Sequence, residues 1–167
     1  MLYQKKIMEH FRNPKNVGKM KDYDGLGKAG NLRCGDIMYL YIKVGKNKKK
    51  EKIIKDISFE TFGCTVAIAN TSLLTTMVKG KTLKEAMKIS KEDLLKELGE
   101  VPSIKVHCSI LATDALAEAI YDYFKRNKEP IPKELEKEHE RIKKAEKIIE
   151  KKHAELVKIE KKIHGKD

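Results

Sequence analysis

The sequence contains no tryptophan, only four prolines and few aromatic residues, which make up 6% of its 167 positions. None of its apolar runs approaches the ~20 residues of a membrane-spanning helix, so we expect no membrane partner. The first residues, MLYQKKIMEHF, are charged and lack an apolar signal core, which favours a cytoplasmic protein. Three cysteines cannot all pair internally, and thiols in a reducing compartment are more often free or metal-bound than bridged.

Acidic residues are in the minority: 37 lysines and arginines against 25 aspartates and glutamates give a net charge of +12. A basic surface of this kind attracts nucleic acid. The densest basic stretch, GKNKKKEK at 45–52, lies between two strand-like runs and has no interleaved aromatic residue that could stack on a base. We therefore interpret these lysines as a solvated turn and expect no nucleic-acid partner.

The first third of the chain predicts one helix and a β-hairpin. Apolar residues recur every four positions over 2–11, which is typical of a short amphipathic helix. The glycine-rich and charged segment 19–33 predicts a mobile loop. The alternating, β-branched and aromatic runs 37–44 and 53–62 predict two antiparallel strands. A third strand is expected because an isolated hairpin is marginal in water, but no pattern locates it.

The centre of the chain predicts helices. The run from Thr65 is apolar with a helical period and stops at Gly80, while TLKE (82–85) and SKED (90–93) have the spacing of capping boxes. After Pro102, residues 109–126 predict a strong amphipathic helix. A hairpin followed by several helices indicates an α+β fold, a small antiparallel sheet of two to three strands covered by helices.

The last part of the chain is predicted to be an extension outside the domain. Pro130 and Pro132 end the helical domain, so we divide the chain into a domain of residues 1–130 and an extension of residues 131–167. The extension predicts a long charged helix with one apolar stripe that repeats every seven residues: Leu135, Ile142, Ile149, Leu156 and Ile163. Its second heptad position is poor, so the stripe packs on the domain or pairs the chain weakly into a homo-oligomer.

The three cysteines, Cys34, Cys64 and Cys108, are separated by 30 and 44 residues, which matches no compact metal knuckle. Cys64 and Cys108 each precede a predicted helix, with Thr65 and Ser109 as the expected N-caps. The partial positive charge of a helix N-terminus lowers thiol pKa values, so both sulfurs are expected to have thiolate character. These local contexts favour a shared site over three separately packed thiols.

Three further residues complete the candidate site. Lys105 brings a cation close to Cys108, and His107 offers an imidazole beside the same thiol. Asp36 lies two positions after Cys34, so an extended backbone would direct both side chains to the same side. Thiolates, an imidazole and a carboxylate suit zinc or an iron–sulfur cluster better than magnesium or calcium.

Two other interpretations use the same residues. In the first, the protein is a thiol enzyme with Cys108 as nucleophile, His107 as base and Asp36 as the group that orients the base. In the second, it is a structural zinc-binding protein whose basic surface binds nucleic acid. Read singly, Asp36 is also an ordinary turn residue and His107 an ordinary surface or capping residue.

Five segments occur together in a known order. They are HFRNPKNVG, CGD, FGCTVAIA, VKGKTLKEA and KVHCSILATDALAEAI, and the resemblance that they carry covers roughly residues 1–127. In sequence and spacing they resemble the iron–sulfur cluster assembly scaffold family of the IscU/NifU N-terminal domain type. The resemblance implies an α+β fold and a carrier rather than a turnover enzyme. Such a carrier builds a [2Fe-2S] cluster from Fe²⁺ and persulfide sulfur and passes it on.

The resemblance also implies residue roles. It makes three thiolates the cluster ligands: Cys34, Cys64 and Cys108. Cys108 is in addition the persulfide acceptor, assisted by Lys105. The fourth ligand is either Asp36 or His107, and the resemblance does not choose between them. The same pocket is expected to hold Zn²⁺ in the apo form.

The implied partners are a cysteine desulfurase as sulfur donor, apo iron–sulfur proteins as recipients, and a frataxin-like protein and a ferredoxin as accessory proteins. One segment departs from the family. The chaperone-recognition sequence Leu-Pro-Pro-Val-Lys reads VPSIK here, with Ser103 replacing the second proline. Because proline stiffens an extended recognition segment, a DnaK-type chaperone is a doubtful partner.

Overall fold

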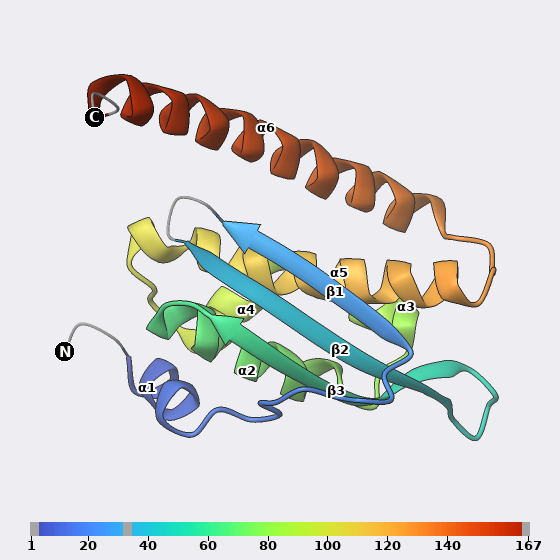
Figure 1. Ribbon diagram of the computed structural model, residues 1–167. Helices are drawn as coiled ribbons and strands as arrows, with labels where there is room; N and C mark the ends of the chain where they lie inside the picture. Colours follow the sequence, from blue (N-terminus) through green and yellow to red (C-terminus); the bar gives the residue numbers. More distant parts are fainter. Residues whose placement is uncertain (1–3, 32–34, 165–167) are drawn as a thin grey trace.

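The computed structural model describes residues 4–31 and 35–164 and has the predicted α+β architecture (Figure 1). Three antiparallel strands form one sheet in the order β1–β2–β3, with bounds Gly25–Asn31, Asp36–Lys46 and Lys52–Phe62. The helices are α1 (Lys5–Arg12), α2 (Thr65–Val78), α3 (Leu83–Ala86), α4 (Lys91–Leu98), α5 (His107–Arg126) and α6 (Lys133–His164). Within the described ranges, no helix combines the length and apolar character that crossing a membrane requires.

The sheet buries one face under helices and leaves the other open. Figure 1 shows α2 and α5 behind the strands, while the near face of the sheet carries no helix. Along β2, Met38, Leu40 and Ile42 point toward the helices and are fully buried, whereas Ile37 is 40% exposed. This period-2 alternation is what the sequence 37–44 predicts for a half-buried strand, so both strands of the predicted hairpin are confirmed.

The third strand, β1, lies inside the segment predicted to be a mobile loop, and that prediction is wrong. Its sequence, GLGKAGN, lacks the β-branched residues that mark strands, yet it pairs with β2 along its whole length. The glycines are there because α5 crosses β1 at backbone contact distance. A Cβ atom on Gly25 would overlap the carbonyl oxygen of Ala119, and one on Gly27 that of Ala115. Gly25 and Gly27 therefore permit close helix–strand packing and do not indicate a flexible loop.

The variant Gly27→Ala therefore tests whether close packing against α5 is the reason for glycine at this position. The added methyl group has to push the backbone of α5 away from β1, which is expected to lower the free energy of unfolding by ~1–3 kcal/mol or more. Gly30→Ala is the matched control, because its nearest neighbour would be the backbone oxygen of Asp36 at 3.9 Å, and it should change stability by less than about 0.5 kcal/mol. Urea titration measures both, and equal midpoints for the two variants would contradict this account of β1.

Two short helices begin as the sequence predicts. At α3, the Thr82 side chain accepts from the Glu85 backbone N–H while the Glu85 carboxylate accepts from the Thr82 N–H. At α4, Ser90 and Asp93 form the same reciprocal pair. Each capping box satisfies backbone donors that a helix start would otherwise leave unpaired, so both predicted helix starts are confirmed.

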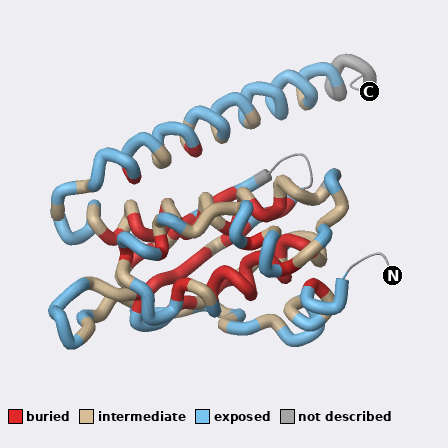
Figure 2. The backbone as a smooth tube through the Cα atoms, turned by 180° about the vertical axis from the view of Figure 1, so that it is seen from behind, coloured by how far each residue is buried: buried red, intermediate tan, exposed pale blue. Residues whose placement is uncertain are grey.

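The extension forms the long charged helix α6, which packs back on the domain through its first part. Leu135 and Ile142 are buried, whereas Leu156 is 63% exposed, and Figure 2 shows the exposure of α6 increasing toward its end. Polar contacts to α5 accompany the apolar ones: Arg141 pairs with Asp114, and Glu118 accepts from His139 at 2.7 Å and faces Lys143 at 3.5 Å. Among the stripe residues whose side chains the structure describes, Leu135 and Ile142 are thus buried, Ile149 is partly buried and Leu156 is exposed.

Candidate metal centre

Three of the predicted site residues converge in one cluster, which we call the thiol pocket. The carboxylate of Asp36 and the sulfurs of Cys64 and Cys108 can be chosen so that all three ligand atoms lie within 4.8 Å of one another. The two sulfurs are 3.4 Å apart, and the Cys108 sulfur is 3.7 Å from Asp36 Oδ2. Asp36 and Cys108 are buried and Cys64 is partly buried. Such a cluster of soft sulfurs and one carboxylate is a metal-ligating set.

Each residue of this cluster is held at the start of a different element. Asp36 is the first residue of β2, Cys64 is the N-cap of α2, and Cys108 lies in the first turn of α5. Two glycines shape the connections. Gly35 has φ +70°, in the left-handed region that favours glycine, and a Cβ on Gly63 would come within 3.3 Å of the Asp36 carboxyl carbon.

The helix starts differ from the prediction in detail. Cys64 itself occupies the N-cap of α2 instead of Thr65, and Val106, after a 3₁₀ turn of Ser103–Lys105, occupies that of α5 instead of Ser109. Neither cap residue makes a side-chain capping hydrogen bond. Both sulfurs nevertheless lie at helix N-termini, where unpaired backbone N–H groups and the helix dipole favour negative charge.

The thiol of Cys64 has a lowered pKa. A hydrogen bond from the Cys108 thiol lowers the pKa of Cys64 from 9.0 to about 6, and the backbone N–H groups of Ala67 and Val66 act in the same direction. Partial burial and the Asp36 carboxylate oppose this shift and are outweighed. Near neutral pH Cys64 is therefore a thiolate that accepts a hydrogen bond from the Cys108 thiol, a charge state that favours a bound cation.

This assignment predicts the pH dependence of Cys64 alkylation. Because the thiolate is the reactive form, the rate with iodoacetamide should rise around pH 6 and level off by about pH 7, well below the ~8.5 midpoint of an ordinary cysteine. Cys108→Ala removes the largest cause of the shift and should move the midpoint upward. Mass spectrometry of the peptide that contains Cys64 gives the rate, and a wild-type midpoint near 8.5 would contradict the assignment.

Of the three other predicted site residues, Cys34 lies outside the described part of the chain. Lys105 ends the 3₁₀ turn that leads into α5. His107 opens α5 beside Cys108, but its ring nitrogens are not part of the 4.8 Å set formed by the described residues. Its Nε2 atom is buried and has no hydrogen-bond partner among those residues.

Residue Asn70 was missed by the sequence analysis. It is fully buried in α2 and accepts a hydrogen bond at 3.1 Å from Ser109, the residue after Cys108. A signal for it exists in the sequence, because Asn70 interrupts the apolar run VAIANTSLL of a helix that is buried nearly all round. A polar residue in such a place has to find a partner inside the protein.

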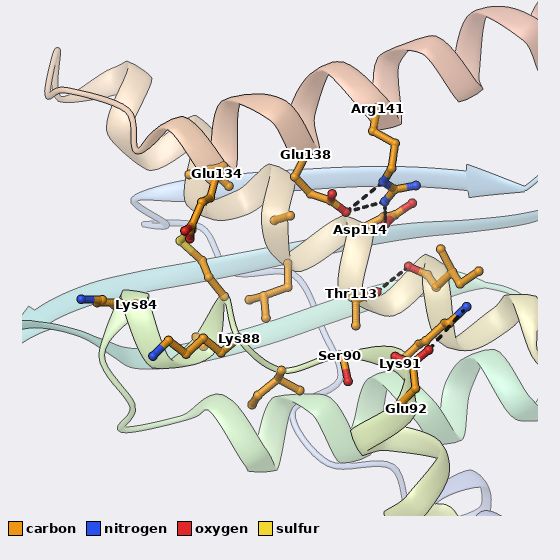
Figure 3. A pocket seen from close by; sticks show the side chains of 17 residues that line it. Lys84, Lys88, Ser90, Lys91, Glu92, Thr113, Asp114, Glu134, Glu138 and Arg141 are labelled. Atoms are coloured by element: carbon orange, nitrogen blue, oxygen red, sulfur yellow. Dashed lines mark hydrogen bonds and ion pairs between the residues drawn. The ribbon is translucent and has the colours of Figure 1, made fainter.

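A separate cavity of about 520 Å³ lies between α5, α6 and the α3–α4 segment (Figure 3). Met87, Ile110 and Leu135 contribute apolar wall, and the paired Asp114 and Arg141 lie on the side of α6. Burial raises the pKa of Asp114 to about 6, against the opposing effect of Arg141. Neither of the two described cysteines lines this cavity, and Asp36 does not line it either.

Comparisons with known proteins agree with this geometry. Residues 2–130 match the family model of the NifU-like N terminal domain. The chain is 51% identical over 148 residues to an iron–sulfur cluster assembly scaffold protein IscU of Archaeoglobus fulgidus, covering 87% of this chain and 94% of the relative. It is 48% identical over 126 residues to IscU of Escherichia coli, covering 74% and 94%.

A solved structure shares the fold. It is that of a putative iron–sulfur cluster assembly scaffold protein for the SUF system from Fervidobacterium islandicum, with a TM-score of 0.58 at 24% identity. The similarity covers 72% of this chain and 97% of that one.

Proposed function

Because the chain belongs to the NifU-like N-terminal domain family, we propose that it is a scaffold on which iron–sulfur clusters are assembled and from which they are passed on. The observation that carries this proposal is the meeting of Asp36, Cys64 and Cys108 within 4.8 Å. Thiolates are the usual protein ligands of iron–sulfur clusters, and a partly exposed site suits a cargo that has to leave again.

We assign the [2Fe-2S] cargo to Cys34, Cys64 and Cys108, with either Asp36 or His107 as the fourth ligand. Asp36 has proximity to both described sulfurs in its favour. His107 has a buried nitrogen in its favour, since a buried polar atom without a partner is costly and a metal bond would relieve that cost. Zn²⁺ would use the same donors in the absence of iron.

Sulfur would arrive as a persulfide on Cys108. The Cys108 thiolate attacks the outer sulfur of a donor persulfide, a new S–S bond forms on Cys108, and the donor leaves as a thiolate. Cys108 first has to lose its proton, and two acceptors are in reach: the Cys64 sulfur at 3.4 Å and Asp36 Oδ2 at 3.7 Å. Lys105, at the end of the preceding turn, supplies a cation near the developing charge.

The partners follow from this chemistry. A cysteine desulfurase supplies the persulfide, a frataxin-like protein assists assembly, a ferredoxin supplies the electrons that reduce the sulfane sulfur to sulfide, and apo iron–sulfur proteins accept the cluster. The protein itself turns over no substrate. The thiol-enzyme alternative has less support, because among the described residues Cys108 contacts Cys64 and Asp36, whereas the ring nitrogens of His107 lie outside this 4.8 Å set.

Anaerobic reconstitution tests the proposal. With Fe²⁺, sulfide and a thiol reductant, the wild type should take up about one [2Fe-2S] cluster per chain, followed by its visible absorption and iron content. Cys34→Ala, Cys64→Ala and Cys108→Ala should each abolish or strongly reduce uptake. Of Asp36→Ala and His107→Ala, the variant that lowers cluster uptake more strongly identifies the fourth ligand. The exposed residues Asp22 and His153, each replaced by alanine, are the matched controls. Full uptake by all three cysteine variants would refute the proposal.

We further propose that residues 1–130 form the scaffold domain and residues 131–167 an extension that braces α5. A chain that ends at residue 130 should fold, because the sheet and its covering helices are complete without α6. It should be less stable, since burial of Leu135 and Ile142 contributes ~1.5–3 kcal/mol each before the cost of ordering the helix.

A chain that ends at residue 150, which retains the partly buried Ile149, is the control for this truncation. It keeps both buried side chains and loses the part of α6 where Leu156 and Ile159 are exposed, so its urea midpoint should match the wild type. Failure of the 1–130 chain to fold would contradict the proposed division.

A further inference from the structure

A buried hydrogen bond links the two helices that carry the thiols. The Ser109 hydroxyl, on α5, donates to Asn70 Oδ1, on α2, at 3.1 Å, and both residues are fully buried. Ser109 directly follows Cys108 in the first turn of α5. The bond therefore joins α2 and α5 immediately behind the site, at the ends of the helices where the sulfurs lie.

The second hydrogen bond of Asn70 leads to the other sulfur. Its Nδ2 atom donates at 3.0 Å to the carbonyl oxygen of Val66, in the first turn of α2. Val66 follows Cys64, the N-cap of α2, by two residues. The link thus runs from Ser109, the chain neighbour of Cys108, through Asn70 to the first turn of α2 beside Cys64.

Stability alone does not account for a polar pair at this place. An amide and a hydroxyl in a fully apolar surrounding lose their hydration, and an apolar pair of similar shape is often as stable. Asn70 also differs from its neighbour Thr71, which is equally buried but bonds only the Ala67 carbonyl of its own helix among the hydrogen bonds of the described residues. What Asn70 adds is a directional link that fixes α2 relative to α5.

We propose that Asn70 and Ser109 are positioning residues, which hold Cys64 and Cys108 at the separation that a shared metal ion or cluster requires. This inference rests on the proposed function of the site, and it assigns a role to two residues that contact no ligand themselves. Residues behind metal ligands that fix ligand orientation typically change metal affinity by about 10–100-fold when they are altered.

The decisive variant is the double substitution Asn70→Leu with Ser109→Ala. It removes both hydrogen bonds and leaves no polar group unpaired at either position, so the fold is expected to persist with a urea midpoint near that of the wild type. Anaerobic titration with Co²⁺ alone should show affinity weaker by about 10-fold or more. The thiolate-to-cobalt charge-transfer band should also weaken, because a wider gap between the sulfurs disfavours ligation by both.

Thr71→Val is the matched control, since it deletes a buried hydrogen bond of the same helix without touching the link to α5. It should keep the Co²⁺ affinity and the charge-transfer band of the wild type. If the double variant does not fold, the milder Ser109→Ala variant decides by the same comparison. Wild-type affinity and an unchanged band in a folded variant without the Asn70–Ser109 bond would overturn the inference.

Failure of this inference is distinguishable from failure of the proposed function. The wild-type protein and its cysteine variants test the function in the reconstitution experiment, independently of Asn70 and Ser109. A wild type that takes up its cluster, together with a double variant of unchanged affinity, would leave the scaffold function standing and remove only the positioning role.

Discussion

The contact between the backbone of α5 and strand β1 is the constraint on which the rest of the structure depends. Because Gly25 and Gly27 have no side chains, α5 can lie directly on the strand, and its carbonyl groups occupy the space that Cβ atoms would need. This contact fixes the position of α5 over the sheet. The N-terminus of α5 then meets the start of β2 and the end of β3, and Cys108 meets Asp36 and Cys64 there.

The site combines this rigid placement with an unbalanced set of charges. A carboxylate and two sulfurs, one of which is a thiolate near neutral pH, lie together with a single thiol proton shared among them. Burial would ordinarily suppress such negative charge. The helix N-termini and the shared proton make it tolerable, and a bound cation would neutralise it outright. The pocket is therefore better suited to the loaded than to the empty state.

The sequence predicts well those features that depend on local patterns. Apolar and polar residues alternate along strands β2 and β3, and the capping boxes at Thr82 and Ser90 have a fixed spacing. Each of these features can therefore be predicted without knowledge of tertiary contacts. A third strand was expected but could not be located, because the glycines of β1 are required by contact with Ala115 and Ala119 of α5, far along the chain, which no local pattern reveals. The caps of α2 and α5 were misassigned because the helices begin one and three residues from where hydroxyl side chains suggest. Asn70 was missed because its partner lies on another helix.

Helix α6 is held unevenly along its length. At 1.5 Å per residue, its 32 residues extend for roughly 48 Å, and the helix runs alongside the domain (Figure 1). Only its first part is held against α5, and the remainder is mostly exposed (Figure 2). Packing therefore adds little to the backbone hydrogen bonds of this remainder, and it should open more readily than the part that is packed on α5.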